Sequence, residues 1–116
     1  MNQQELWNKI KENSYLLEFR MRQNSKLNKC GFPGSFAHAT KIFQICYELN
    51  ALGYQFYTEA KFKTVGRADI FIPELSVAIE VLETEQDKSI LEKQEKYPCR
   101  IVALHTTDKF TEELIC

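Results

Sequence analysis

The sequence lacks the features that mark several common classes of protein. No run approaches the roughly 20 apolar residues that a membrane-spanning helix needs, and the first residues contain no apolar core of the signal-peptide type. The four cysteines are too far apart to form a CxxC or similar ligand pair, which argues against structural zinc and favours free thiols in a reducing compartment. These absences predict a soluble, cytoplasmic domain.

Two catalytic signatures are also missing. The chain has no glycine-rich phosphate-binding loop, and no Ser or Cys nucleophile has a base near it in the sequence. The net charge of −1 argues against a generally basic nucleic-acid-binding protein. The charge is uneven, however, because residues 1–67 hold ten Lys and Arg against five Asp and Glu, whereas residues 68–116 hold five against eleven. A basic surface beside an acidic, cation-collecting cleft is compatible with this distribution.

The chain of 116 residues is long enough for one domain with one core. We expect residues 1–34 to form an N-terminal helical extension with a loop, packed on a core of residues 35–116. Within that core, Ser35 is a plausible N-cap and Gly53 a plausible C-terminal stop of an amphipathic helix. Its apolar stripe recurs at helical spacing through Ala39, Ile42, Cys46 and Leu49.

Three strands should follow this helix, at residues 54–62, 67–72 (RADIFI) and 76–82 (SVAIEVL). A second helix is expected from Thr84 to about Tyr97, since the residue before Pro98 avoids the α region. RIVAL (100–104) reads as a fourth buried strand, and residues 108–115 as a short terminal helix. This order predicts an α/β fold with a mixed four-stranded sheet flanked by helices.

Two acids interrupt the apolar second and third strands. A symmetric hairpin centred on Glu74 and Leu75 pairs residues whose numbers add up to 149, so Asp69 lies opposite Glu80 on one face, with Cβ atoms about 4.5–5.5 Å apart. Two ionised carboxylates about 5 Å apart repel by roughly 3 kcal/mol at an effective dielectric constant of about 20. A shared proton, a nearby Lys or Arg, or a divalent cation must offset this repulsion, and Mg²⁺ suits such oxygen ligands.

Two readings without a metal stay open. In one, Asp69 pairs with Arg67 while Glu80 sits at an exposed end of the sheet. In the other, the acids are a purely structural pair, so that Glu80→Gln would remove their repulsion without a metal to lose and would stabilise the protein.

The segment from Ser35 to about Leu104 resembles the core of the PD-(D/E)xK nuclease superfamily, which has a restriction-endonuclease-like α-β-β-β-α-β order. HATKIFQICYELNALGYQFYTEAKF, followed by GRADIFI and AIEVLETE, is most similar to the branch with competence-type and VRR-type nuclease domains. The resemblance implies that Asp69 and Glu80 hold Mg²⁺ or Mn²⁺. Glu59 stands where that branch often has another metal-binding acid, and it reads equally well as an exposed strand residue.

The chain departs from the family at position 82, where Leu82 stands in place of the motif lysine that helps to orient the attacking water. The superfamily tolerates a lysine supplied from elsewhere. Lys93 on the second helix is the first candidate, because its stem could reach the sheet. The second is Lys41 with His38, three residues apart on the first helix. Lys61 and Lys63 on the first strand are the third, and each single lysine can also be a solvated surface cation.

The resemblance thus implies a metal-dependent DNA endonuclease or exonuclease that selects structures or ends, as repair, recombination or defence enzymes do. Asp69, Glu80, Lys93, Glu59 and Lys41 are its candidate catalytic residues. A homodimer would supply a second active site. The DNA backbone would follow basic residues that include Arg67, Lys61, Lys63, Lys41 and His38. Leu82 keeps an alternative open, in which the chain is a catalytically inactive nuclease-like module that binds DNA or protein.

Overall fold

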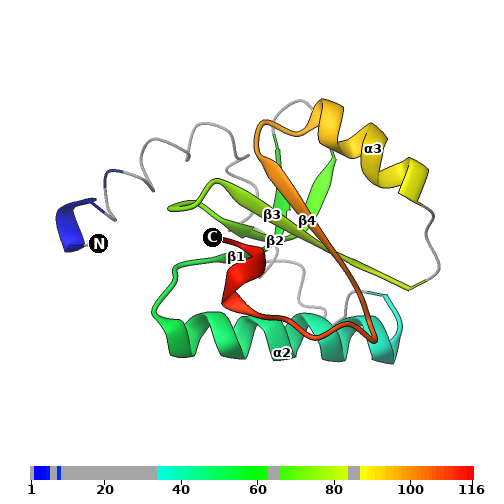
Figure 1. Ribbon diagram of the computed structural model, residues 1–116, viewed down its shortest axis with the longest axis horizontal. Coiled ribbons are helices and arrows are strands. Elements are labelled where there is room, and N and C mark those ends of the chain that lie inside the picture. Colours follow the sequence, from blue (N-terminus) through cyan, green and yellow to red (C-terminus); the bar gives the residue numbers. More distant parts are fainter. Residues whose placement is uncertain (1, 6–7, 9–33, 63–65, 84–86) are drawn as a thin grey trace, which may run out of the picture.

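The computed structural model describes residues 2–5, 8, 34–62, 66–83 and 87–116. A helix, three strands, a second helix and a fourth strand follow in the predicted order (Figure 1). The elements are α2 (Phe36–Leu52), β1 (Tyr57–Lys61), β2 (Arg67–Ile72), β3 (Val77–Leu82), α3 (Asp87–Lys96), β4 (Arg100–His105) and the short 3₁₀ helix η2 (Glu112–Leu114). The predicted order of helices and strands is confirmed.

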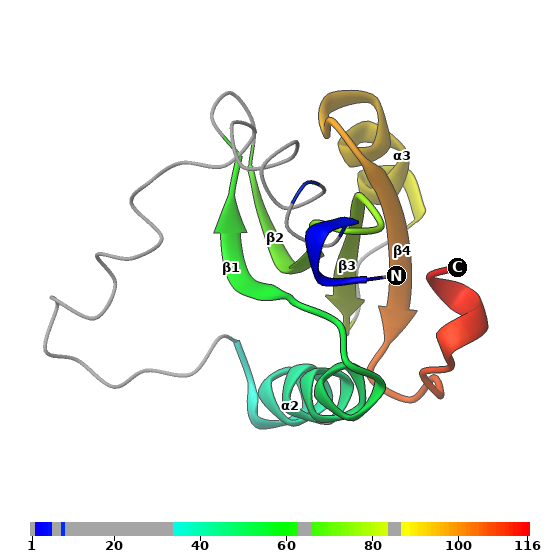
Figure 2. The same ribbon diagram turned by 90° about the vertical axis from the view of Figure 1, so that its left-hand side faces the viewer.

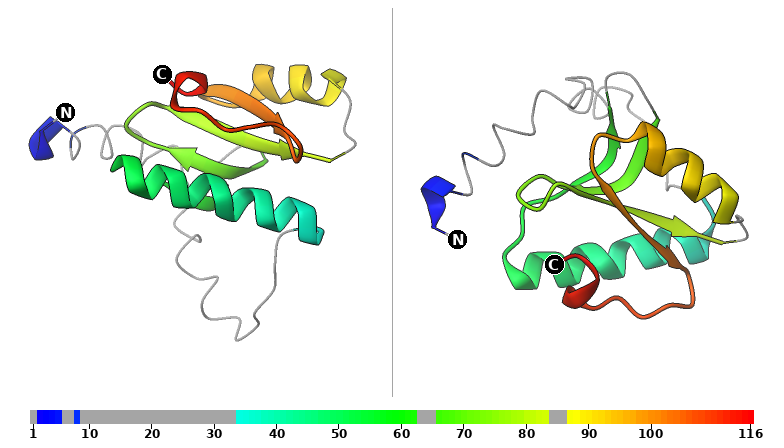
Figure 3. Two further views of the ribbon diagram at one scale, coloured as in Figure 1. Left: turned by 60° about the horizontal axis from the view of Figure 1, so that its bottom comes forward. Right: turned by 45° about the horizontal axis from the view of Figure 1, so that its top comes forward.

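The four strands form one mixed sheet in the order β1-β2-β3-β4. Strand β2 runs antiparallel to both β1 and β3, and β4 runs parallel to β3. Helix α2 lies against one face of the sheet and α3 against the other (Figures 2 and 3). The predicted α/β fold with a mixed four-stranded sheet and flanking helices is therefore confirmed.

Helix α2 begins and ends where the sequence predicted. The Ser35 side chain accepts a hydrogen bond of 3.2 Å from the His38 N–H, which satisfies one unpaired donor of the first turn. At the other end, Gly53 adopts φ 87°, a left-handed conformation that favours glycine, and its N–H returns to carbonyls of the last turn. The buried side of the helix carries Ile42, Ile45 and Leu49.

The sheet separates two apolar clusters. The larger cluster joins α2 to one face of the strands and to the C-terminal segment, with Ile45, Ile70 and Ile79 completely buried in it. The smaller cluster lies on the α3 face, where the Phe62 ring packs edge-on against Phe71 and Tyr97. Each central strand is thus covered on both faces, which explains why β2 and β3 read as nearly continuous apolar runs.

The hairpin between β2 and β3 has the predicted register. Ile70 pairs with Ile79, Phe71 with Ala78 and Ile72 with Val77, so that each pair of numbers adds up to 149. The turn spans residues 73–76 and is closed by hydrogen bonds from Leu75 N–H to the Ile72 carbonyl and from Ser76 N–H to the Pro73 carbonyl. The ladder stops at Ile70 and Ile79, so the predicted pair of Asp69 with Glu80 lies just beyond it.

Strand β1 is shorter than predicted, beginning at Tyr57 instead of residue 54. The preceding backbone has other partners, since Tyr54 N–H donates to the Leu49 carbonyl and Gln55 N–H donates to Glu74 Oε1 at 3.2 Å. These groups therefore connect the end of α2 with the hairpin turn instead of forming ladder bonds.

Some predictions fall outside the described residues. They include most of the N-terminal helical extension over residues 1–34, the start of the second helix at Thr84 and the position of Lys63. The boundary at residue 34 stays a prediction as well.

Within the described part of the chain, no helix combines the length and the apolar character needed to cross a membrane.

The buried side of α2 provides a test of the fold. Leu49 is 0% exposed, whereas Leu52 on the same helix is 47% exposed. We expect Leu49→Ala to lower the free energy of unfolding by about 2–5 kcal/mol, because it leaves a cavity in the larger cluster. Leu52→Ala should cost less than about 1 kcal/mol. Urea unfolding of both variants checks this, and equal losses would contradict the packing of α2 on the sheet.

Candidate active site

The sheet divides where the two acids lie. The β2–β3 ladder ends at the pair of Ile70 and Ile79, although β2 begins at Arg67 and β3 continues to Leu82. Before Ile70, β2 is paired with β1, and after Ile79, β3 is paired with β4. Asp69 Oδ2 accepts a hydrogen bond of 2.8 Å from the Val81 N–H. The Asp69 side chain therefore accepts the hydrogen bond that a backbone carbonyl of β2 would accept in a continuous ladder. Polar groups can lie between the two apolar strands at this point.

Asp69 is also held from the α2 side. His38 Nε2 lies 3.4 Å from Asp69 Oδ1, and both side chains are mostly buried. Gly34, which precedes the helix, has φ 69°, and a Cβ atom added there would lie 2.9 Å from the His38 ring. Glycine at this position thus fits the backbone and leaves space for the imidazole.

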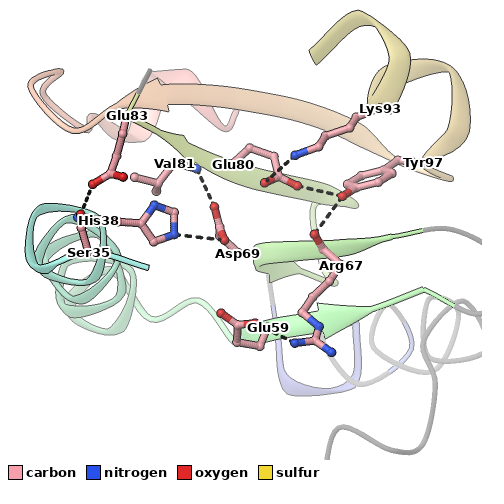
Figure 4. Close-up of polar contacts among 10 residues, drawn as sticks. All are labelled: Ser35, His38, Glu59, Arg67, Asp69, Glu80, Val81, Glu83, Lys93 and Tyr97. Carbon is pink, nitrogen blue, oxygen red and sulfur yellow. Dashed lines mark hydrogen bonds and ion pairs between the residues drawn. The ribbon is translucent and has the colours of Figure 1, made fainter. Parts of the chain in front are cut away.

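Glu80 is the more deeply buried acid, with only 3% of its surface exposed. Its Oε1 accepts a hydrogen bond of 2.9 Å from the Tyr97 hydroxyl, and its Oε2 lies 3.6 Å from Lys93 Nζ (Figure 4). Lys93 comes from α3, and Tyr97 directly follows that helix, so both side chains approach from the face opposite α2. The Lys93 side chain remains partly exposed, whereas the Glu80 side chain is buried.

Burial is the main reason why Glu80 holds its proton tightly. Loss of hydration raises its pKa, and the charge of Asp69 and a hydrogen bond between the two acids raise it further. The charge of Lys93 and the hydrogen bond from Tyr97 act in the opposite direction without cancelling the effect. The pKa of Glu80 rises from 4.5 to about 7. The lysine therefore compensates only part of the repulsion between the carboxylates, and below about pH 7 the pair keeps a proton.

Tyr97 connects the acid to the backbone of β2. Its hydroxyl lies 2.9 Å from the Arg67 carbonyl as well as 2.9 Å from Glu80 Oε1. Burial and then the charge of Glu80 raise the pKa of this phenol, so it remains a neutral donor. The sequence placed Tyr97 only among apolar positions near the end of a helix. Its spacing of four residues from Lys93 was the signal that both could reach one acid.

The reading in which Asp69 pairs with Arg67 is wrong. Arg67 instead pairs with Glu59, with Nη1 3.2 Å from Oε2. Glu80 does not lie at an exposed end of the sheet. Glu59 itself has φ 52°, an uncommon conformation for a residue other than glycine, at the one position where the ladder between β1 and β2 skips a pair. Its carboxylate therefore faces an arginine while Asp69 and Glu80 contact α2 and α3.

The candidate lysines separate in space. Lys93 contacts Glu80, whereas the Lys41 ammonium group donates to the Asp108 carbonyl and is buried against the C-terminal segment. His38 and Lys41 thus have different partners, although they lie three residues apart on α2. Lys61 is half-buried on β1. Leu82, at the motif position, is 2% exposed and offers no polar group.

The donor set fits a hard cation. Among the residues that the structure describes, no three His, Cys, Asp or Glu side chains gather closely enough to enclose a metal ion. Mg²⁺ does not require such a cage, since it commonly takes one or two carboxylates and completes its shell with water and substrate phosphate. Asp69 and Glu80 supply two carboxylates whose repulsion the neighbouring lysine leaves partly uncompensated. These two residues would hold the ion.

No family model, curated protein or solved structure matches this chain.

The pKa of Glu80 predicts how stability depends on pH. A rise from 4.5 to about 7 corresponds to roughly 3 kcal/mol. Because the folded pKa is raised, this contribution is fully present below about pH 4.5 and is lost as the pH rises through about 7. Glu80→Gln keeps the acceptor for Tyr97 but removes the titration. At pH 8 without divalent cations, we expect the variant to unfold at a higher urea concentration than the wild type.

Glu95→Gln is the matched control, since Glu95 is exposed on α3. It should leave the pH dependence of urea unfolding unchanged. The assigned pKa would be contradicted if the wild type and Glu80→Gln showed the same dependence of unfolding free energy on pH between pH 5 and pH 8.

Proposed function

We propose that this chain is a metal-dependent deoxyribonuclease domain of the PD-(D/E)xK type with a restriction-endonuclease-like topology. Asp69 and Glu80 would hold Mg²⁺ or Mn²⁺, and Lys93 would replace the motif lysine. The observation that carries the proposal is the ammonium group of Lys93, 3.6 Å from Glu80 Oε2. A cation from another helix thus stands beside the acid whose own strand carries Leu82.

The side chains divide the work of phosphodiester hydrolysis. When bound, the divalent cation would neutralise the carboxylates and stabilise negative charge on the phosphate oxygens. Lys93, held by Glu80 and partly exposed, can donate a hydrogen bond to the attacking water or to a phosphate oxygen. Water adds to phosphorus and loses a proton to the solvent, while the bond to the leaving oxygen breaks and that oxygen takes up a proton from the solvent. Tyr97 and the Val81 N–H keep the two carboxylates in place during this step.

Glu59 is not part of the metal site that we propose. Its carboxylate pairs with Arg67, so it serves to orient that arginine on the β1–β2 side. Arg67 is more than half exposed and remains a candidate contact for the DNA backbone. Of the other basic residues that we expect to contact DNA, Lys41 is the weakest candidate, because it is buried and bound to a carbonyl.

Leu82 supports an alternative, a nuclease-like module that binds DNA or protein without cutting. Its buried apolar side chain occupies the motif position completely. In that case the Lys93–Glu80 pair would only offset charge within the fold. Activity with divalent cations separates the two functions.

The test measures cleavage of labelled single-stranded, duplex and branched DNA with Mg²⁺ or Mn²⁺. We expect the full chain to cut at least one substrate and Asp69→Asn to abolish cutting. Lys93→Met should lower the rate by about 100-fold or more, as the loss of a preorganised charge-stabilising donor does elsewhere. Lys96→Met is the control on the same helix, since Lys96 is exposed.

A second readout separates loss of the ion from loss of the chemistry. Calorimetric titration with Mn²⁺ should show binding to the wild type and to Lys93→Met, and none to Asp69→Asn. Absence of cleavage on every substrate together with absence of Mn²⁺ binding would exclude the nuclease. Mn²⁺ binding without cleavage would favour the inactive module.

A further inference from the structure

A cavity of about 820 Å³ adjoins the candidate active site. It lies between α2 and β1, and Asp69 and Glu59 form part of its wall. Its size falls within the range of about 300–1,000 Å³ that is usual for pockets that bind small molecules. The cavity therefore meets the candidate metal site at one shared residue, Asp69.

The rest of the wall is mostly apolar and aromatic. Phe36, Phe43 and Phe56 contribute rings, and Ile42 adds aliphatic surface. Phe36 is 88% exposed and Phe43 is 68% exposed, which is unusual for side chains of this size. Two large exposed rings on one helix, both facing the same cavity, indicate a surface that binds a planar apolar group.

The charge of the cavity selects what can enter. Of the described residues that line it, none is Lys or Arg, and the two charged ones are the carboxylates of Glu59 and Asp69. The described lining residues therefore include no Lys or Arg that would hold a phosphate group. An uncharged ring with N–H donors at its edge would stack on the phenylalanines and could donate to a carboxylate. Nucleobases have both properties, and their exocyclic amino groups are such donors.

We propose that this cavity binds unpaired nucleobases, so that the adjoining acids act on single-stranded or frayed DNA. The inference rests on the proposed function and names its substrate class. Bases in a duplex are stacked and paired, so only an unpaired strand can turn its bases into the cavity. The phosphate between two such bases then remains outside the cavity, near Asp69, which lines its wall.

The experiment compares strands that differ only in their bases. Fluorescence anisotropy of the full chain is measured with a labelled single-stranded oligonucleotide, an abasic strand with the same number of phosphates, and the corresponding duplex. EDTA is present, so that metal-dependent cleavage cannot occur. We expect the strand with bases to bind at least about 10-fold more tightly than the other two, because stacking on aromatic rings contributes to each bound base.

Phe36→Ala should weaken binding of the single strand by roughly 5- to 100-fold, and leave binding of the abasic strand unchanged. Phe36→Tyr should retain the wild-type affinity. Tyr47→Ala is the matched control, because Tyr47 is 68% exposed on the same helix but does not line this cavity. Since Phe36 is so exposed, its replacement leaves the core intact.

Three results would overturn the inference. One is equal affinity for the normal and the abasic strand, which would show that phosphates alone are bound. Another is an equal effect of Phe36→Ala and Tyr47→Ala. The third is a change of oligomeric state in Phe36→Ala without a change in DNA binding, since a second copy of the chain would then cover the rings. Base-dependent binding without cleavage in Mg²⁺ or Mn²⁺ would instead refute only the nuclease.

Discussion

The mutual repulsion of Asp69 and Glu80 is the constraint around which the centre of this molecule is arranged. The polar contacts of the two carboxylates offset this repulsion in different ways. The Val81 N–H gives Asp69 a hydrogen bond at the place where two strands separate, and Lys93 gives Glu80 a counter-charge. Because burial still raises the pKa of Glu80, these contacts leave a deficit of positive charge. Under the proposed function, a divalent cation supplied from outside would complete the arrangement in place of the proton.

The architecture brings these groups together from three directions. The hairpin supplies both acids, α2 supplies His38, and Lys93 and Tyr97 come from α3 and the residue that follows it. The layers are held by apolar packing on both faces of the sheet, so the polar site occupies only the seam where β2 leaves β3. The cavity lined by Phe36 opens beside this seam. Substrate selection is thus proposed for the α2 side of the sheet and catalysis for the seam, and the two meet at Asp69.

The sequence predicted most of the fold and the register of the hairpin that carries both acids. Period-two strands around a short turn leave few registers, so the pairing of Ile72 with Val77 could be derived, whereas the expected pair of Asp69 with Glu80 lies just beyond the last pair of the ladder. Helical spacing also made Lys93 the first candidate for the missing cation. The hydrogen bond from Val81 to Asp69 and the pairing of Arg67 with Glu59 could not be derived. They depend on where the ladders stop and on one uncommon φ angle, which no periodic pattern encodes.

The position of α3 has a consequence for the order in which the protein assembles. The hairpin joins its strands through a short turn, so the two acids can meet early, while water still surrounds them and their repulsion is only about 1 kcal/mol. Packing of α3 on the sheet removes that water, because the Tyr97 ring covers this face. The same event delivers the Lys93 ammonium group to Glu80. The loss of water, which strengthens the repulsion, and the arrival of the Lys93 charge, which opposes it, therefore occur in the same step. No folding intermediate has to contain a desolvated pair of carboxylates without a counter-charge.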